Sequence, residues 1–335
     1  METKRKKRVL SGTRPTGKLH IGHLCGALKN YVALQDEYDC FYTIVDWHAL
    51  TSEYANPSII KESTYEIVAD WLAAGLDPEK STLFIQSHVL QHAELHVLLS
   101  MIVPIPWLER VPTYKEQQLQ LPDKDLATYG FLGYPLLQTA DIIIYKAECV
   151  PVGEDQVPHI ELAREIVRKF NRLYGEVFPE PKPLLTELPL IPGTDGRKMS
   201  KSYGNAVYLS DDPEIIRTKI LKMVTDPQRT HRNISGNPDV CPVFSLHKLF
   251  SSADTIALVN TECRKAGIGC VDCKKMLLEG LLRVLAPHVE KRNAYMKEPG
   301  YIADILKKGA EKAEQVTEAT LVEVRKAMQL IPRIP

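Results

Sequence analysis

The feature that most constrains this fold is a regular alternation of strand-like and helix-like segments over the first third of the chain. Residues 40–45 and 82–85 are rich in aromatic and β-branched residues, and each run is followed by apolar residues at helical spacing. A short strand ending at Leu10 comes before a helical segment with Leu24 and Leu28 one turn apart. Strands that alternate with helices form a parallel sheet covered by helices, and ligands bind at the carboxyl ends of its strands. The sequence therefore predicts an α/β fold around a parallel sheet.

The alternation gives way to a helical tail in the second half of the chain. Residues 104–130 are irregular and rich in proline, which indicates an insertion into the sheet domain. A loop rich in glycine and lysine, residues 192–205, ends this half, and the pattern is almost wholly helical from Asp212 onward. We expect a sheet domain over residues 1–205 and an all-helical C-terminal domain over residues 206–335.

Composition limits the cellular setting and the partners. No apolar run approaches the about eighteen residues that a membrane span needs, so we expect no membrane partner. Cys25, Cys40 and Cys149 lie among apolar neighbours, which is typical of reduced thiols in a cytoplasmic protein. The formal net charge is zero. A nucleic-acid surface must then be local, and its two candidate stretches, residues 164–172 and 217–232, could equally be solvated helix faces.

A candidate anion site lies where the first helix begins, in the run Leu19-His20-Ile21-Gly22-His23. Backbone N–H groups at a helix N-terminus favour anions, and a glycine there lets a flat base or ribose approach the backbone. His20 and His23 are three residues apart, so both imidazoles can face one phosphate group. Paired histidines at a helix start are often incidental, so this motif does not decide the function alone.

A second candidate is the run Lys198-Met199-Ser200-Lys201-Ser202 on the glycine-containing loop. Two lysines on such a loop can clamp a polyphosphate and stabilise the charge of a departing group. A solvated basic loop is the alternative interpretation of a lone lysine pair.

The two runs, in this order and separation, resemble the two signatures of class I aminoacyl-tRNA synthetases. The resemblance extends over essentially the whole chain from Val9. It implies a Rossmann-like catalytic domain, ATP with Mg²⁺, an aminoacyl-adenylate intermediate and a tRNA partner. A small nucleotidylyltransferase also begins a helix with a His-x-Gly-His pattern, but the lysine loop and the long helical tail count against that alternative.

A third stretch bears on which amino acid is bound. Tyr134, Gln138 and Asp141 share one face of an expected helix, at spacings of four and three. A buried carboxylate on an apolar helix is costly without a donor, and an indole N–H or a tyrosine hydroxyl is such a donor. Local capping or pairing of Asp141 is the alternative.

A fourth stretch, residues 150–156, follows as a strand and a turn. Val150 and Val152 point to one side of the strand and offer an apolar slot for an aromatic ring. Gly153 lets the backbone approach a ligand. Asp155 begins a helix and could hold the ribose or the substrate's ammonium, directly or through Gln156.

These two stretches resemble the tryptophanyl and tyrosyl subgroup of class I. The sequence Val-Gly-Glu-Asp-Gln at residues 152–156, the turn at residues 12–17 and the run at residues 46–50 are similar to the tryptophanyl pattern, whereas tyrosyl enzymes usually carry a Gly-Gly pair. The resemblance implies L-tryptophan and tRNA(Trp) as substrates, a homodimer and no DNA partner. Tyrosine activation, or a non-catalytic paralogue that binds tryptophan or tRNA, remains open.

The resemblance also assigns roles to single residues. The catalytic set is His20, His23, Lys198 and Lys201. The ATP-binding set is Arg14, Pro15, Thr16, His20, Gly22, His23, Gly153, Glu154, Asp155, Gln156, Lys198, Met199, Ser200, Lys201 and Ser202. The tryptophan-binding set is Asp141, Tyr134, Gln138, Val150, Val152 and His48. Many bacterial tryptophanyl enzymes have glutamine in place of Arg14, methionine in place of Gln138 and Thr-Ile-Gly-Asn in place of residues 20–23, which leaves the roles of Arg14 and Gln138 open.

Four further cysteines cluster in the helical tail, at Cys241, Cys263, Cys270 and Cys273. A Cys-x-x-Cys pair with two more thiolates is the ligand inventory of tetrahedral zinc or a 4Fe–4S cluster. The last three resemble the cluster loop of a DNA-repair endonuclease family, and the four resemble the iron–sulfur site of a subset of bacterial tryptophanyl enzymes. The resemblance implies a 4Fe–4S cluster that braces the helical domain near the anticodon, with Zn²⁺ or no metal as alternatives.

Overall fold

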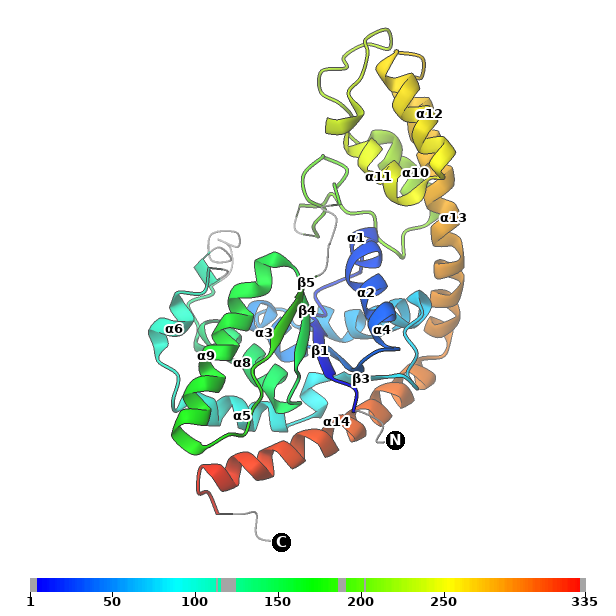
Figure 1. Cartoon of the computed structure of the whole chain (residues 1–335). Helices are drawn as coiled ribbons and strands as arrows, with labels where there is room; N and C mark the ends of the chain where they lie inside the picture. Colours follow the sequence, from blue (N-terminus) through cyan, green and yellow to red (C-terminus); the bar gives the residue numbers. More distant parts are fainter. Residues whose placement is uncertain (1–4, 113, 116–124, 186–190, 202, 332–335) are drawn as a thin grey trace.

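A computed structural model of the chain describes residues 5–112, 114–115, 125–185, 191–201 and 203–331. It shows a sheet domain from which a helical lobe projects (Figure 1). The strands are β1 (Arg8–Thr13), β2 (Asp39–Ile44), β3 (Ser81–Ile85), β4 (Cys149–Val152) and β5 (Lys182–Leu185). The helices and turns of the sheet domain are α1 (Ile21–His23), η1 (Leu24–Leu28), α2 (Lys29–Leu34), α3 (Asp46–Glu53), α4 (Ser58–Ala74), η2 (Gln86–His88), α5 (Gln91–Ser100), α6 (Ile105–Glu109), α8 (Tyr129–Ile144), η3 (Glu154–Gln156) and α9 (Val157–Tyr174). The later elements are α10 (Pro213–Lys222), η4 (Pro238–Val240), α11 (Pro242–Phe250), α12 (Ala253–Arg264), α13 (Cys270–Lys297) and α14 (Pro299–Ala327).

The strands form a parallel sheet in the order β3-β2-β1-β4-β5, which confirms the predicted α/β fold. The chain adds β2 and β3 on one side of β1, and then β4 and β5 on the other side. The strand order therefore reverses between β1 and β4. A crevice for ligands forms at the carboxyl ends of the strands beside such a reversal. The sequence after β1 and after β4 is thus placed to form one site.

Alternate residues of the strands pack into separate cores on the two faces of the sheet. Val9 and Tyr42 belong to the core that also contains residues of α2, α4 and α13. Leu10 and Phe41 belong to the core that also contains residues of α5, α8 and α9. Helices cover both faces of the sheet. The ends of the strands are therefore the place where a substrate can reach it.

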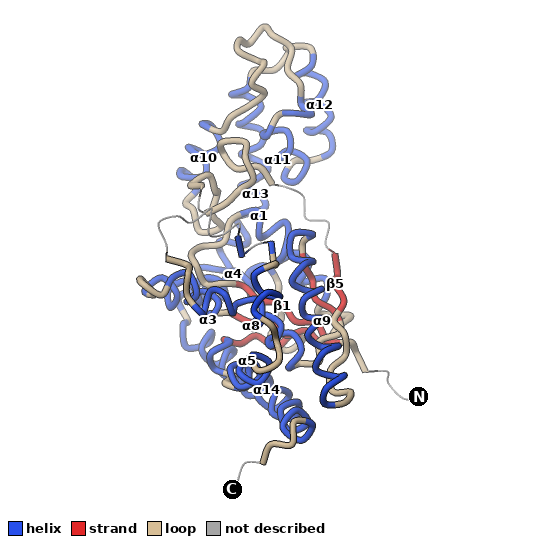
Figure 2. Tube along the Cα trace, turned by 90° about the vertical axis from the view of Figure 1, so that its left-hand side faces the viewer, coloured by secondary structure: helices blue, strands red, loops and turns tan. Residues whose placement is uncertain are grey.

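The helical tail divides between the lobe and the sheet domain. Helices α10 to α12 and the start of α13 form the lobe, whereas the later part of α13 packs on α4 (Figures 1 and 2). His288 of α13 contacts Asp70 of α4, with 3.1 Å between Nε2 and Oδ1. Helix α14 then packs along β3. From the sequence we predicted one helical domain over residues 206–335. In the structure the last helix of that range, α14, packs on the sheet domain.

The expected irregular insertion, residues 104–130, is more helical than predicted: its described part contains the short helix α6, helical residues at 112, 114 and 115, and the first two residues of α8. Over the described residues, we find no helix with both the length and the apolar character that crossing a membrane requires.

Candidate active site

The two histidines of the first helix have their tautomers set by backbone bonds. Nδ1 of His20 accepts the N–H of Gly22 at 3.1 Å, and Nδ1 of His23 accepts the N–H of His20 at 3.1 Å. A nitrogen that accepts carries no proton, so each neutral ring has its proton on Nε2. Burial, with a smaller contribution from Lys201, lowers the pKa of His20 to about 4. Burial, with contributions from His20 and Lys201, also lowers the pKa of His23 well below its usual value. Both rings are therefore neutral Nε2–H donors near pH 7.

Gly22 is required by the position of the His20 ring. A Cβ on Gly22 would lie 2.8 Å from Cε1 and Nδ1 of that ring. Any side chain at this position would push the ring off the bond that fixes its tautomer. From the sequence we expected a glycine here for a different reason, namely that a base or ribose can approach the backbone closely.

The lysine loop is held in shape by Asn205, which sequence reasoning did not select. Its buried amide accepts the N–H of Ser200 at 2.8 Å through Oδ1. Its Nδ2 donates to Oδ1 of Asp195 at 2.7 Å and to the carbonyl oxygen of Lys198 at 3.2 Å. One amide thus cross-links both ends of the loop. Asn205 comes a few residues after the lysine run. Its side chain therefore holds the end of the loop, where the chain returns toward a helix, against the earlier part of the loop.

The structure separates the two lysines of this loop. Lys201 reaches toward the first turn of the chain, where Nζ donates to the carbonyl oxygen of Gly17 at 2.6 Å. Lys198 is exposed. The side chain of Met199 is buried in the core, so it anchors the loop, and its N–H donates to the carbonyl oxygen of Ile191 at 2.9 Å. Ser202 lies outside the described residues.

Asp141 is buried on α8 and accepts bonds from long-range partners. Nε2 of His48 lies 3.0 Å from Oδ2. Nε2 of Gln86 lies 2.9 Å from Oδ1 and 2.8 Å from Oδ2. Nδ1 of His92 lies 2.7 Å from Oδ1. Burial raises the pKa of this carboxyl, but the charges and bonds of His92 and His48 outweigh burial, and the net shift is downward. The sequence predicted an indole N–H or a tyrosine hydroxyl as the donor, with local capping or pairing as the alternative. In the structure the donors are instead three side chains from distant segments.

Gln86 and His92 were missed by sequence reasoning. Both follow β3, one directly after the strand and one in the first turn of α5. The carboxyl end of a parallel strand is where such polar residues gather, and this signal was available in the sequence.

A chain of neighbours joins the lysine loop to the buried carboxylate. Arg14 is close enough to Lys201 to lower its pKa, and it also interacts electrostatically with Tyr134. The rings of Tyr134 and His159 are 5.6 Å apart between centroids. Burial, with a smaller contribution from His48, lowers the pKa of His159 to about 4. This chain of neighbours runs from the turn after β1 to α8 and α9.

Other predicted residues lie on α8, on β4 and directly after β4. Val150 and Val152 are buried in the core on the face that carries α8 and α9. Gln138 is half-buried on α8. Turn η3 carries Glu154, Asp155 and Gln156 directly after β4, and Nε2 of Gln156 donates to Oδ2 of Asp155 at 3.1 Å.

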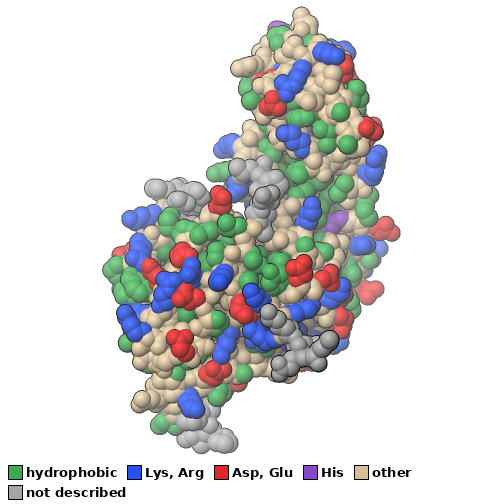
Figure 3. Space-filling view, in the orientation of Figure 1, with side chains coloured by type: hydrophobic (Ala, Val, Ile, Leu, Met, Phe, Trp, Pro, Cys, Tyr) green, Lys and Arg blue, Asp and Glu red, His purple; other side chains and the backbone are tan. Residues whose placement is uncertain are grey.

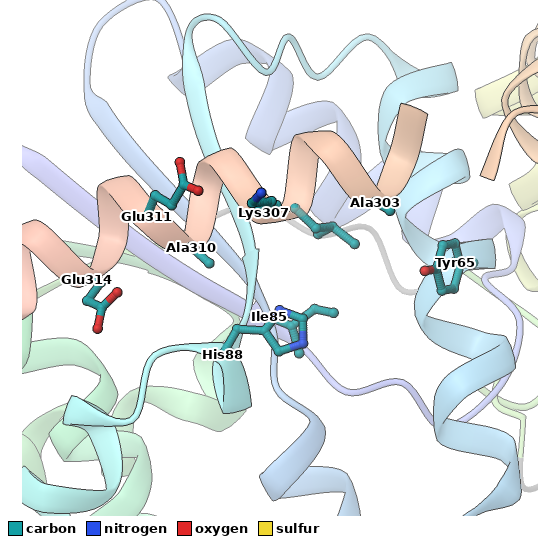
Figure 4. A pocket seen from close by; sticks show the side chains of 9 residues that line it. Tyr65, Ile85, His88, Ala303, Lys307, Ala310, Glu311 and Glu314 are labelled. Carbon is teal, nitrogen blue, oxygen red and sulfur yellow. The ribbon is translucent and has the colours of Figure 1, made fainter. Parts of the chain in front are cut away.

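A cavity of about 310 Å³ lies elsewhere, between α14 and the end of β3 (Figure 4). Its lining residues are Tyr65, Ile85, His88, Ala303, Leu306, Lys307, Ala310, Glu311 and Glu314. Glu311 and Glu314 would repel the phosphates of a nucleotide, so this cavity does not compete with the site at the strand ends.

Comparison with known proteins agrees with the geometry. The family model described as tRNA synthetases class I (W and Y) matches residues 1–286 of the chain. The chain belongs to this family. The tryptophan–tRNA ligase of Thermotoga maritima is 55% identical over 97% of this chain and 99% of its own length. The tryptophan–tRNA ligase of Ralstonia nicotianae is 45% identical over 97% of this chain and 98% of its own length.

Solved structures show the same relation within this synthetase family. A tryptophanyl-tRNA synthetase from Campylobacter jejuni, complexed with ADP and tryptophan, has a TM-score of 0.88 and 33% identity, covering 96% of this chain and 100% of its own. A tyrosyl-tRNA synthetase from Archaeoglobus fulgidus, complexed with L-tyrosine, has a TM-score of 0.65 and 20% identity, covering 87% of this chain and 92% of its own. The second likeness shows the shared fold alone.

The four clustered cysteines do not confirm the predicted metal. Their thiols are close enough to interact: burial, followed by the charges of Cys241, Cys263 and Cys270, raises the pKa of Cys273 to about 12. Among the residues that the structure describes, however, no group of three or more His, Cys, Asp or Glu side chains is arranged to hold a metal ion. Neither the 4Fe–4S cluster nor the Zn²⁺ alternative is shown.

Proposed function

We propose that this chain uses ATP to activate L-tryptophan and transfers it to the 3′ terminal adenosine of tRNA(Trp), with release of pyrophosphate and AMP. The proposal is supported by a chain of neighbouring groups that runs from the two histidines and Lys201, through Arg14, Tyr134 and His159, to His48 and Asp141. Its full-length relatives at 55% and 45% identity are tryptophan–tRNA ligases.

The proposed reaction is adenylyl transfer, in which the carboxylate of tryptophan attacks the α-phosphorus of ATP. His20 and His23 donate hydrogen bonds to phosphate oxygens as charge develops on them. Lys201 neutralises the leaving pyrophosphate, and Mg²⁺ enters with the phosphates of ATP and shields their charge. No side-chain nucleophile is needed, since the protein positions the reactants and stabilises charge.

Asp141 is the proposed acceptor of the indole N–H. Its two oxygens have about four lone-pair positions, and the three donor groups of the structure already use them. Tryptophan must therefore replace one donor. All three donors are buried, and His48 is the least buried of them, with 9% of its side chain exposed against 0% for His92. We infer that His48 gives way to the indole N–H.

The test is pyrophosphate exchange with tryptophan and tyrosine in parallel. We expect exchange with tryptophan and an at least about 100-fold lower specificity constant with tyrosine, because the pocket must match both ring size and hydrogen bond. Faster exchange with tyrosine would overturn the assignment. Tight tRNA binding without exchange would support the non-catalytic paralogue.

The pKa of Lys201 predicts a pH dependence. Burial and then the charge of Arg14 lower this pKa to about 8, against the opposing charges of Asp70 and Glu66. The ammonium loses its charge as pH rises through about 8, so kcat/KM for ATP should fall with it. Lys201→Arg keeps its charge and should remove the fall, whereas the exposed Lys198→Arg should retain it. A fall at the same pH in Lys201→Arg would contradict this role.

We also propose that the four cysteines hold a 4Fe–4S cluster, with Zn²⁺ as the alternative. The support is the donor set itself: four thiols from three segments interact in one lobe, and four thiolates require a cation to coexist. The cluster would brace the lobe. Broad visible absorbance and iron in anaerobically purified protein support it, zinc alone supports the alternative, and neither metal contradicts both. Tryptophan-dependent exchange should persist in Cys270→Ser, whereas lobe stability should fall.

A homodimer is proposed from an apolar surface on the sheet domain. Val97, Met101, Ile105 and Tyr129 are each at least half exposed, and hydrophobic side chains gather over α6 (Figure 3). These residues lie in or just before the expected insertion, residues 104–130, around which we propose that the two subunits meet. A charge buried there is costly, so Met101→Glu should convert a dimer to a monomer in sedimentation experiments. Val322→Glu, on the exposed side of α14, is the matched control and should remain dimeric.

The projecting lobe is the proposed anticodon-binding part of residues 206–335. Crosslinks from the tRNA(Trp) anticodon to residues 224–271 would support this role, and crosslinks confined to α5 and α8 would contradict it.

We also propose that the protein acts in the cytoplasm, where its seven cysteines stay reduced.

A further inference from the structure

A second layer of buried residues lies behind Asp141. Nε2 of His92 is 2.8 Å from the hydroxyl of Tyr145, on the side of the ring away from the carboxylate. His92 and Tyr145 are both completely buried. The Tyr145 ring is packed against Phe41 and Phe84, with centroids 4.7 Å and 5.7 Å away. The hydroxyl therefore has little freedom to choose another partner.

One bond direction here follows from chemistry alone. An ionised carboxylate only accepts, so Nδ1 of His92 must donate to Asp141. The other ring nitrogen, Nε2, pairs with the hydroxyl of Tyr145, which can donate to a neutral imidazole or accept from a charged one. Gln86 is oriented in the same way: its Oε1 accepts the N–H of Trp47 at 3.2 Å, which leaves its Nε2 to face the carboxylate. Both fixed donors of Asp141 are thus set by residues further from the site.

We propose that Tyr145 and His92 are positioning residues that determine specificity for an indole N–H. The Tyr145 hydroxyl holds the His92 ring in the orientation in which Nδ1–H binds Asp141, and His92 in turn aims the carboxylate. Asp141 then keeps Oδ2 toward the substrate when His48 gives way. This inference rests on the proposed function of Asp141 as the indole acceptor.

Loss of the hydroxyl has a defined consequence. Without it, Nε2 of His92 loses its partner, and the ring can turn away from the 2.7 Å contact between Nδ1 and Oδ1 of Asp141. The carboxylate then loses a fixed donor and can turn, which misplaces the acceptor. A substrate that offers no N–H has no bond to lose, so its binding should not change.

The experiment compares tryptophan with a tryptophan analogue in which sulfur replaces the indole N–H. Binding of both ligands is measured for the wild-type chain, Tyr145→Phe and a matched control, Tyr42→Phe. Tyr42, on β2, is another completely buried tyrosine, and its hydroxyl donates to the carbonyl oxygen of Tyr31 at 3.1 Å. We expect Tyr145→Phe to weaken tryptophan by about 5- to 10-fold, with the sulfur analogue within about twofold, and Tyr42→Phe to affect neither ligand selectively.

A second pair of variants keeps the test informative if the first is poorly folded. His92→Asn retains a donor near the position of Nδ1 and loses the contact with Tyr145. It should keep most of the preference for tryptophan over the sulfur analogue, and adding Tyr145→Phe to it should have no further effect. His92→Leu should abolish the preference.

Two outcomes would overturn the inference. The first is an equal loss of both ligands in Tyr145→Phe, which indicates a merely structural role. The second is an unchanged preference in His92→Leu. Absence of tryptophan-dependent exchange in the wild-type chain would instead count against the proposed function, so the two failures are distinguishable.

Discussion

Replacing His20 with alanine should lower kcat for tryptophan-dependent pyrophosphate exchange by about 100- to 1,000-fold, with a small change in the KM for ATP. Loss of one preorganised donor to a charge that develops in the transition state has an effect of this size. Nε2–H of His20 is such a donor because its Nδ1 is held by the N–H of Gly22 and its ring is neutral near pH 7. Steady-state exchange rates measured at saturating ATP and tryptophan test this.

His20 also caps the first helix, so its variants must separate capping from catalysis. His20→Ala loses the cap as well and should destabilise the chain by about 1 kcal/mol. Asparagine is a good N-cap residue, but its shorter side chain cannot reach the position of Nε2. His20→Asn should therefore regain stability without regaining rate. His231→Ala, at an exposed loop histidine, is the matched control. Full activity in His20→Asn would show that capping was the essential role.

Gly309→Ala should destabilise the chain by about 3 kcal/mol or more, because it forces a helix away from the sheet. A Cβ on Gly309 of α14 would lie 1.8 Å from the carbonyl oxygen and 2.7 Å from the carbonyl carbon of Leu83 in β3. Both contacts are to backbone, which cannot rotate aside. Equilibrium unfolding in urea gives the free energy, and hydrogen exchange of the β3 amides reports where the structure loosens.

The same helix supplies the control. A Cβ on Gly300 of α14 would have no atom within 4 Å apart from the helix's own backbone. Gly300→Ala should therefore be neutral or stabilise the chain by up to about 1 kcal/mol, through helix propensity alone. Equal stability of the two variants would mean that α14 does not rest on β3.

The architecture of the sheet and part of the site followed from local sequence. The period of the apolar residues predicted parallel strands and helices, and the structure confirms the parallel sheet. The positions of His20 and of the lysine loop could be predicted because each motif lies at a strand end or a loop next to a glycine turn. Their chemistry needs only a few neighbouring residues, so a short stretch of sequence contains it.

The sequence by itself determined the periodic elements, the family motifs and the presence of a buried acid on α8. Only the tertiary structure decided that His48, Gln86 and His92 surround Asp141, since 93, 55 and 49 residues separate them from it along the chain. It also decided that α14 lies on β3. An apolar stripe on a helix indicates that one face is buried, but it does not indicate which surface covers that face. Contacts between Asp141 and its distant donors depend on the strand order, which no local pattern specifies.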